Sequence, residues 1–238
     1  MSMSAQPPID GAVASGQRHA MDRMYRFQRH IYDATRRFYL LGRERLISEL
    51  GVPENGSVLE VGCGTGRNLV KVASAYPSAR VHGFDISSEM LKSAGTAIVR
   101  SGLTDRIAIA EGDALTFDPR LAFGVAAFDR VYLSYTLSMI PQWQQALAHA
   151  VRLVAPGGEL HVADFGLSES APAPLRAALF WWLRQFHVTP RAELPDVLSA
   201  MAQEADVPCR VRSSYAGYAW NLRAGPFARP AANSSLWP

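Results

Sequence analysis

Short apolar runs alternate with amphipathic segments through the middle of the chain. The apolar runs predict buried strands over 57–62, 81–85, 106–113, 128–136 and 159–165. The amphipathic segments predict helices over 68–76, 87–102 and 142–154, and a Pro-Gly-Gly turn at 156–158 follows the last of them. Strands that alternate with helices predict βαβ units, and therefore an α/β fold whose parallel sheet is covered on both faces.

The two ends of the chain depart from this alternation. Apolar positions between 21 and 50 recur at helical spacing, with a break near Gly42, and predict an N-terminal helical cap over 18–50. After Phe165 a proline-punctuated aromatic helix forms an insertion over 166–190, followed by a helix over 192–205 and a closing hairpin over 211–224. We therefore expect a flexible leader (1–17), one domain (18–225) and a tail (226–238).

Three tyrosines, Tyr25, Tyr32 and Tyr39, lie seven residues apart in the N-terminal cap. On a helix this spacing places them on one face. Packing against the domain explains Tyr39 and Phe38 best. Electron-rich rings also attract cations, so the stripe also fits a site for a cationic ligand.

Composition and charge narrow the class of protein. The 238 residues contain only two cysteines, Cys63 and Cys209, which predicts a reducing, cytoplasmic setting without a disulfide framework. No secretory leader pattern occurs, and no apolar run approaches the roughly 20 residues of a membrane span. Residues 18–45 hold eight arginines against three acids, and the chain after Asp206 holds four arginines and no acid. Cationic ends favour an anionic partner, either a membrane surface or a nucleic acid.

A glycine-rich turn follows the first predicted strand, in the sequence Glu60-Val-Gly-Cys-Gly-Thr-Gly66. Its G-x-G-x-G spacing differs from the G-x-G-x-x-G fingerprint of dinucleotide sites, because Arg67 occupies the sixth position. Glycines let the backbone approach a ligand closely, and the helix that follows offers unpaired N–H groups. The turn therefore predicts a binding site for a small polar ligand.

The glycine turn, an acid that ends the second strand (Asp85), Gly-Asp-Ala at 112–114 and Pro-Gly-Gly at 156–158 together resemble class I S-adenosylmethionine-dependent methyltransferases over residues 45–165. The resemblance implies a Rossmann-like class I methyltransferase fold, with a mostly parallel seven-stranded sheet and helices on both faces. It also implies S-adenosylmethionine as cofactor and S-adenosylhomocysteine as product.

The same resemblance implies a set of cofactor-binding residues. Glu60 would help position the amino end of the cofactor, and Asp85 would accept both ribose hydroxyls. Ile86 and Met90 would pack on the adenine, whose amino group Asp113 would bind. The full set is Tyr25, Glu60, Gly62, Cys63, Gly64, Thr65, Gly66, Asn68, Asp85, Ile86, Met90, Gly112, Asp113, Ala114, Ser134 and Ser138.

The segments 21–47, 133–141 and 186–191, taken with the glycine turn, are similar to bacterial betaine-lipid N-methyltransferases over about residues 21–220. This resemblance implies three methylations of the amino group of diacylglyceryl-homoserine by a protein at the inner face of the membrane. It implies an anionic membrane surface and an upstream aminocarboxypropyl transferase as partners, without nucleic acid or metal. The implied catalytic residues are Tyr32, Tyr135 and His187, and the implied substrate and membrane contacts are Arg36, Arg37, Tyr39, Trp181, Trp182 and Arg191. Paired tryptophans flanked by arginines are typical of a helix in a membrane interface, and a core helix of an inserted lid fits the same pattern.

Other functions fit the same residues. A phosphatidylethanolamine N-methyltransferase would use the same chemistry on a phosphate headgroup, and a quinone or small-molecule methyltransferase would share the helix before the glycine turn. A non-catalytic cofactor-binding subunit or an RNA-binding protein would also suit the cationic ends. RNA is disfavoured because the basic stretches carry no interleaved binding module. The six histidines are scattered without metal-ligand spacing.

Overall fold

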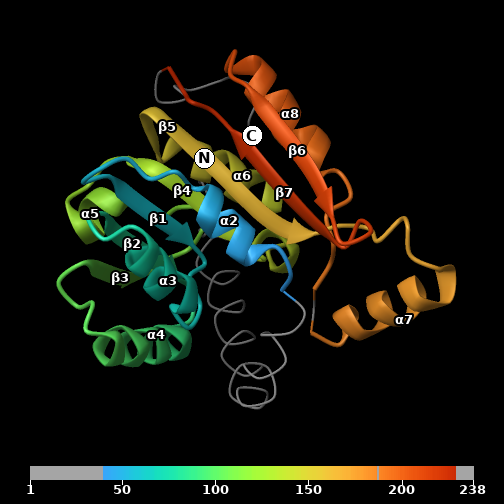
Figure 1. The fold of residues 1–238 in the computed structure, drawn as a ribbon, viewed down its shortest axis with the longest axis horizontal. Coiled ribbons are helices and arrows are strands. Elements are labelled where there is room, and N and C mark those ends of the chain that lie inside the picture. Colours follow the sequence, from blue (N-terminus) through green and yellow to red (C-terminus); the bar gives the residue numbers. More distant parts are fainter. Residues whose placement is uncertain (1–39, 187, 229–238) are drawn as a thin grey trace, which may run out of the picture.

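A single twisted sheet organises the protein, whose computed structural model describes residues 40–186 and 188–228 (Figure 1). Within these residues the strand order is β3-β2-β1-β4-β5-β7-β6. The first five strands in that order are parallel, whereas β7 runs antiparallel to β5 and to β6. The strands are β1 (Ser57–Val61), β2 (Arg80–Asp85), β3 (Ile107–Glu111), β4 (Phe128–Ser134), β5 (Val154–Phe165), β6 (Cys209–Ser214) and β7 (Ala219–Ala224).

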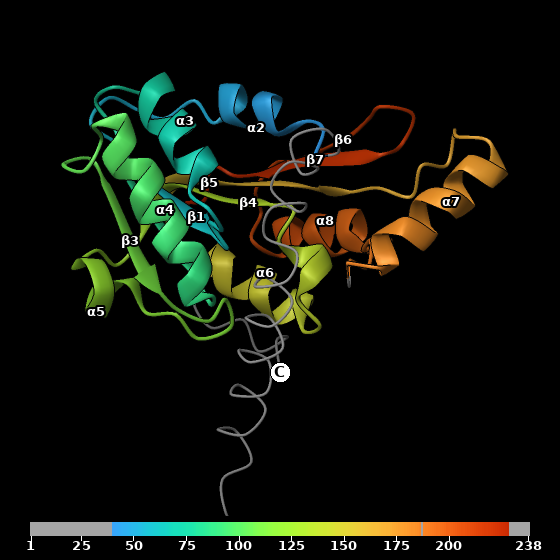
Figure 2. The same cartoon turned by 90° about the horizontal axis from the view of Figure 1, so that it is seen from below.

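Helices cover both faces of the sheet, as the alternating pattern predicts (Figure 2). One core cluster joins α2 and α3 to the sheet through side chains such as Ile47 and Val72, and the other joins α6 and α8 through Leu147 and Leu198. The described helices are α2 (Arg43–Glu49), α3 (Arg67–Ala75), α4 (Ser88–Ser101), α5 (Pro119–Phe123), α6 (Trp143–Arg152), α7 (Ala173–Arg184), α8 (Leu194–Glu204) and the 3-10 helix η1 (Leu137–Met139).

Local sequence explains where several elements begin and end. Ser87 caps α4 by accepting a hydrogen bond from the Met90 N–H, and Gly102 ends that helix with φ 67°. Gly42, with φ 85°, forms the predicted break before α2. The predicted hairpin also forms, since β6 and β7 pair at the edge of the sheet.

Three features differ from the sequence expectation. The short helices α5 and η1 were not predicted, because each is too short to show periodicity. The prediction of a turn at Pro-Gly-Gly is wrong, because these residues lie within β5. The pairing of β5 with β4 shifts register there, between Phe128 and Arg130 of β4. The Gly157 N–H donates to the Phe227 carbonyl at 2.7 Å, and Phe227 is buried. The first residues of the predicted tail are therefore packed against the end of the sheet.

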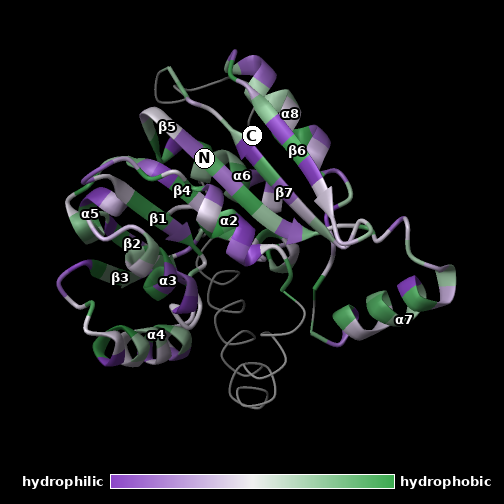
Figure 3. Ribbon diagram, viewed as in Figure 1, coloured by the Kyte–Doolittle hydropathy of each residue, from purple (hydrophilic) through white to green (hydrophobic). Residues whose placement is uncertain are grey.

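Helix α7 lies at the side of the molecule, away from the sheet (Figure 1). Its side chains include Leu175 (62% exposed) and Trp181 (60%), and only Leu183 of the helix is buried. Trp182 makes an edge contact with Phe186, with ring centroids 4.9 Å apart, at the end that returns to the core. Apolar residues run along α7 (Figure 3). Leu175 and Trp181 are exposed, whereas Leu179, Phe180 and Trp182 are partly buried against the core.

Candidate functional site

The glycine turn lies where β1 ends, next to the ends of its parallel neighbours β2 and β4. Gly62, Gly64 and Gly66 all have positive φ, at 70°, 54° and 71°. A Cβ on Gly62 would come within 2.5 Å of Thr136 Cγ2, so glycine is needed there for both conformation and space. Gly66 is the N-cap of α3 and provides no side-chain cap. The turn therefore presents bare backbone beside a helix start.

A pocket opens directly on this turn. It contains seven of the residues predicted to bind the cofactor and three that were not predicted, Leu40, Arg43 and Arg67. The seven predicted residues are Glu60, Gly62, Cys63, Gly64, Thr65, Asn68 and Ser134. The sequence prediction and the pocket geometry thus converge on the same turn, although residues upstream of β1 complete the wall.

Glu60 is the buried carboxylate of the pocket, with only 1% of its surface exposed. Its Oε1 accepts a hydrogen bond from Asn68 Nδ2 at 2.8 Å, and its Oε2 accepts one from the Tyr132 hydroxyl at 2.9 Å. Burial raises the pKa of Glu60 to about 8, against the opposing effects of these two hydrogen bonds and of the Arg43 charge. Such a carboxyl group is stabilised in its charged form by a cation, which an amino group of a ligand would provide.

Asp85 joins the end of β2 to the glycine turn. Its Oδ2 accepts the Gly64 N–H at 2.8 Å and its Oδ1 accepts the Ser87 N–H at 2.9 Å. A carboxylate has about four acceptor positions, so one carboxylate can accept backbone N–H groups and the O–H groups of a ligand at once. The Gly112 N–H donates to the Asp85 carbonyl at 3.0 Å, which brings the end of β3 to the same edge.

The other residues predicted to contact the adenine gather at these strand ends. Asp113 Oδ1 accepts the Leu115 N–H at 2.9 Å, in a tight turn that includes Ala114. Ile86 is half-buried after β2, and Met90 is buried in the first turn of α4. These residues follow the paired strands β2 and β3, and they are not among the residues that line this pocket.

Comparison with known proteins identifies this arrangement. Residues 58–158 match the family model described as "Methyltransferase domain". Residues 58–158 therefore correspond to a methyltransferase domain. The fold agrees, because the mostly parallel seven-stranded sheet is that of the class I methyltransferases.

Individual relatives of the methyltransferase domain differ in chemistry. The chain is 31% identical over 121 residues to Methyltransferase GfsG of Streptomyces halstedii, covering 51% of this chain and 42% of that protein. It is 28% identical to the ubiquinone/menaquinone biosynthesis C-methyltransferase UbiE of Syntrophotalea carbinolica, covering 67% and 65%. Several other relatives are named as O-methyltransferases. The match spans a little under half the length of the Streptomyces halstedii protein and of two other curated relatives.

Among solved structures, Haemonchus contortus phosphoethanolamine N-methyltransferase 2 in complex with S-adenosylmethionine resembles the chain with a TM-score of 0.57. The sequences are 19% identical, and the match covers 72% of this chain and 38% of that one. At this identity the likeness establishes a shared fold.

The pocket fits S-adenosylmethionine, the cofactor of this domain class. The observation that tests the fit is the set of acceptor groups: the buried carboxylate of Glu60 and Ser134 Oγ, which has no partner among the described residues, in the pocket, and the carboxylate of Asp85, which binds the glycine turn next to it. These groups suit an amino group and two hydroxyls. When bound, the cofactor supplies an electrophilic methyl group, and the chain's own residues hold that group in place.

Cys63 lies in the pocket wall as a buried free thiol. Burial raises its pKa well above the ordinary value, and the nearby carboxylates of Asp85 and Glu60 raise it further. A thiol in this setting stays protonated and is a poor nucleophile. Its place between glycines agrees with a small side chain that fills space in the turn.

Two predicted residues of the methyltransferase domain make structural contacts instead of lining the pocket. The Tyr135 hydroxyl, predicted to be catalytic, donates to the Leu41 carbonyl, and burial raises its pKa well above the ordinary value. Ser138, predicted to bind the cofactor, is fully buried, and its N–H donates to Asp164 Oδ2 at 3.2 Å. Their assigned roles stay predictions. The contacts themselves are those of residues that hold neighbouring segments in place.

Arg191, predicted to contact substrate or membrane, clamps η1. Its Nε donates to the Leu137 carbonyl at 3.1 Å and its Nη2 to the Ile140 carbonyl at 2.7 Å. It therefore ties the segment after α7 to the segment after β4. Trp181 and Trp182 lie on α7, as predicted.

Six predicted residues lie outside the described residues, so their positions stay predictions: Tyr25, Tyr32, Arg36, Arg37, Tyr39 and His187. Within the described ranges no group of three or more His, Cys, Asp or Glu side chains could hold a metal ion. Over the same residues, no helix has the length and apolar character to cross a bilayer.

Asp85→Asn is expected to weaken binding of S-adenosylhomocysteine roughly tenfold to hundredfold, because ribose hydroxyls lose a charged acceptor. The asparagine oxygen can accept the Gly64 N–H or the Ser87 N–H but not both, so thermal unfolding of the variant is measured as well, to detect a change in the turn. Calorimetry on both proteins measures the change. Asp118→Asn is the control, since Asp118 also accepts a backbone N–H, from Arg120, but caps the distant α5. Equal affinity of the Asp85 variant and the native protein would remove Asp85 from the ribose site.

Proposed function

We propose that the protein is an S-adenosylmethionine-dependent N-methyltransferase that methylates the amino group of a lipid headgroup. The most specific form of this proposal is three successive methylations of diacylglyceryl-homoserine to the betaine lipid. The methyltransferase domain supports the transfer chemistry, and the sequence resemblance to betaine-lipid enzymes supports the acceptor. The further support is helix α7, which exposes apolar side chains and carries two arginines.

Helix α7 has the composition of an interfacial element. Leu175 and Trp181 are more than half exposed, and the helix carries Arg176 and Arg184 but no acid. Apolar side chains interspersed with arginines suit the boundary between lipid headgroups and acyl chains. The segment after α7 returns to the site, because the Thr189 N–H donates to the Ser138 carbonyl at 2.9 Å. A lipid bound at α7 would therefore lie on an element connected to the loop after β4.

An amine acceptor also places few demands on the catalytic groups of the protein. A neutral amine needs only to lose a proton, whereas oxygen and carbon acceptors usually require a positioned base. Aromatic rings would tolerate an amine that grows by one methyl group at each round. Tyr32 and His187 are the predicted groups for this role.

A direct assay tests the proposal. The protein is incubated with lipid extracts and S-adenosylmethionine labelled in the methyl group, and products are identified by mass spectrometry. The expected result is label on the amino nitrogen of a homoserine lipid, with mono-, di- and trimethylated species. Label on phosphatidylethanolamine would support the phosphate-headgroup alternative. Label only on a quinone ring or a hydroxyl group would overturn the proposal in favour of the chemistry that several relatives carry in their names.

Removing the exposed apolar groups of α7 should weaken membrane association. We expect Leu175→Ala with Trp181→Ala to lower the fraction of protein that sediments with anionic vesicles by at least about fivefold, since each large side chain contributes about 1.5–3 kcal/mol when buried. Arg176→Gln should lower that fraction about fivefold at low salt, and the difference from the native protein should vanish at high salt. Leu121→Ala on α5 is the matched control, because Leu121 is 89% exposed but lies on another surface. Equal losses for Leu121→Ala and the α7 variants would contradict the assignment.

A further inference from the structure

Arg43 is a cation in the wall of the cofactor pocket that the sequence motifs do not single out. It is the first residue of α2, it is half-buried, and it lines the pocket together with Glu60 and the glycine turn. Its charge lowers the pKa of Glu60, against the larger effect of burial, so the two groups lie within electrostatic reach of each other. The pocket is thus lined by both a carboxyl group and a guanidinium cation.

This pair matches a zwitterion. The amino-acid end of S-adenosylmethionine carries an ammonium and a carboxylate on one carbon. Glu60 suits the ammonium, and a guanidinium binds a carboxylate through a planar fork of N–H donors. We infer that Arg43 binds the carboxylate of the cofactor's amino-acid end, opposite the contact of Glu60 with its amino group. The inference rests on the cofactor and not on the proposed acceptor, so the two can fail separately.

Several contacts fix the segment that places Arg43 in the pocket. The Tyr135 hydroxyl donates to the Leu41 carbonyl, and Arg43 Nε donates to the Leu40 carbonyl at 3.2 Å. Gly42 has φ 85°, and a Cβ there would lie 3.0 Å from Asn221 Nδ2 on β7. The turn before α2 is therefore held against β7 and against the residue after β4. This arrangement gives the Tyr135 hydroxyl a positioning role.

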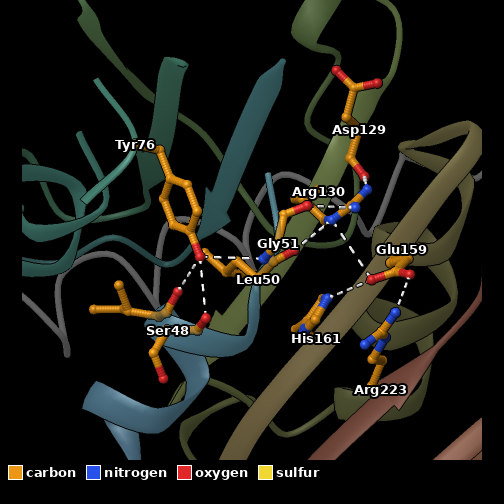
Figure 4. Close-up of polar contacts among 10 residues, drawn as sticks. Ser48, Leu50, Gly51, Tyr76, Asp129, Arg130, Glu159, His161 and Arg223 are labelled. Carbon is orange, nitrogen blue, oxygen red and sulfur yellow. Dashed lines mark hydrogen bonds and ion pairs between the residues drawn. The ribbon is translucent and has the colours of Figure 1, made fainter. Parts of the chain in front are cut away.

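The opposite end of α2 is anchored as well (Figure 4). The Tyr76 hydroxyl donates to the Ile47 carbonyl at 2.8 Å and accepts the Gly51 N–H at 3.2 Å. Arg130 donates to the Leu50 and Gly51 carbonyls. These donors satisfy carbonyl groups that the end of a helix leaves unpaired. With both ends fixed, α2 presents Arg43 to the pocket as a preorganised group, which reduces the entropy lost on binding.

The second arginine of the pocket wall, Arg67, is a weaker candidate. It is exposed at the start of α3, directly after the glycine turn. Solvent weakens the attraction between an exposed guanidinium and a carboxylate. Arg43 is more buried than Arg67, and its charge acts on Glu60, so it is the better partner for the carboxylate next to the amino group.

The test compares two ligands that differ in the amino-acid end. S-adenosylhomocysteine carries the carboxylate and amino group, and 5′-methylthioadenosine has the same adenosine and thioether without them. Calorimetry with the full chain should show that Arg43→Gln weakens S-adenosylhomocysteine roughly tenfold to hundredfold and leaves 5′-methylthioadenosine unchanged. Arg43→Lys should recover part of the loss, since it keeps the charge but not the fork. Arg45→Gln is the matched control on the same helix, because Arg45 pairs with Glu49 outside the pocket, and it should change neither affinity.

Several outcomes would overturn the inference. One is unchanged S-adenosylhomocysteine affinity in Arg43→Gln, which would show that Arg43 does not hold the carboxylate. Another is an equal loss for both ligands, which indicates a displaced helix. A selective loss in Arg67→Gln alone would assign the carboxylate to Arg67. If Arg43→Gln does not fold, Arg43→Lys provides the test. Weaker binding of S-adenosylhomocysteine alone supports the inference, and the same S-adenosylhomocysteine affinity as in the native protein refutes it.

Discussion

Glu159→Gln is expected to lower the free energy of unfolding by about 3 kcal/mol at pH 7, given the pKa shift that it removes. Glu159 is 5% exposed at the start of the regular part of β5, among three basic side chains (Figure 4). His161 Nε2 lies 3.0 Å and Arg130 Nε 3.6 Å from Oε2, and Arg223 bonds Oε1. Removing the charge would leave cations without their partner, which is costly for buried groups.

The pH dependence of this loss follows from the pKa of Glu159. Burial raises that pKa, but hydrogen bonds from His161 and Arg223 and the charges of Arg130 and Arg223 outweigh burial and lower it to about 2, from 4.5. A lowered pKa stabilises the folded state above pH 4.5, and the contribution disappears as pH falls from 4.5 through 2. The difference between the native protein and Glu159→Gln should therefore be constant near neutrality and shrink below pH 4.5.

Urea denaturation at pH 7 and at acid pH measures this difference. Glu49→Gln is the matched control, because Glu49 also pairs with two arginines, Arg45 and Arg212, but its side chain is 48% exposed. It should cost less than about 1 kcal/mol, since solvent screens exposed pairs. Comparing variant with native protein at each pH cancels the opposite contribution of Glu60, whose raised pKa favours folding below pH 4.5 and loses that contribution as pH rises through about 8. Similar losses for both variants would show that the Glu159 cluster adds no special stability.

The parts of the site that follow strand ends could be predicted from sequence. Carboxyl ends of parallel strands meet at one edge, so the glycine turn and Asp85 had to be neighbours once the alternating pattern was recognised. Helix α4 was predictable at both ends, because Ser87 and Gly102 are local capping residues whose effect does not depend on the rest of the fold.

The remaining parts depend on contacts between distant segments. Arg43 enters the pocket because a turn at Gly42 packs on β7, about 180 residues further along the chain, and no local pattern reports that packing. Arg191, which the resemblance assigns to substrate or membrane contact, donates to the Leu137 and Ile140 carbonyls, and no local pattern predicts those bonds. Pro-Gly-Gly suggested a turn from composition, whereas pairing with the C-terminal segment at Phe227 holds it in β5. In each case tertiary contacts decide the outcome over local preference.

Gly62→Ala is expected to impair both stability and cofactor binding. The added Cβ would lie 2.5 Å from Thr136 Cγ2, and Thr136 is held in place because its Oγ1 donates to the Val61 carbonyl at 3.1 Å. A crowded methyl group costs about 1–3 kcal/mol, and the positive φ adds about 1 kcal/mol for a residue other than glycine. Relief of the contact would move the turn that lines the pocket, and a displacement of about 1 Å can cost on the order of a hundredfold in function.

Two companion variants separate the causes of this effect. Gly124→Ala introduces the same substitution at φ 69°, but nothing lies within 4 Å of its Cβ, so it should cost only about 1 kcal/mol of conformational strain and leave binding unchanged. Thr136→Ser removes the threonine methyl group that the added Cβ would strike, so the double variant Gly62→Ala/Thr136→Ser should regain most of the steric loss in stability and part of the affinity. Thermal unfolding and S-adenosylhomocysteine calorimetry on the native protein and these variants provide both readouts. If Gly62→Ala behaves like Gly124→Ala, close packing of the turn against Thr136 does not shape the cofactor pocket.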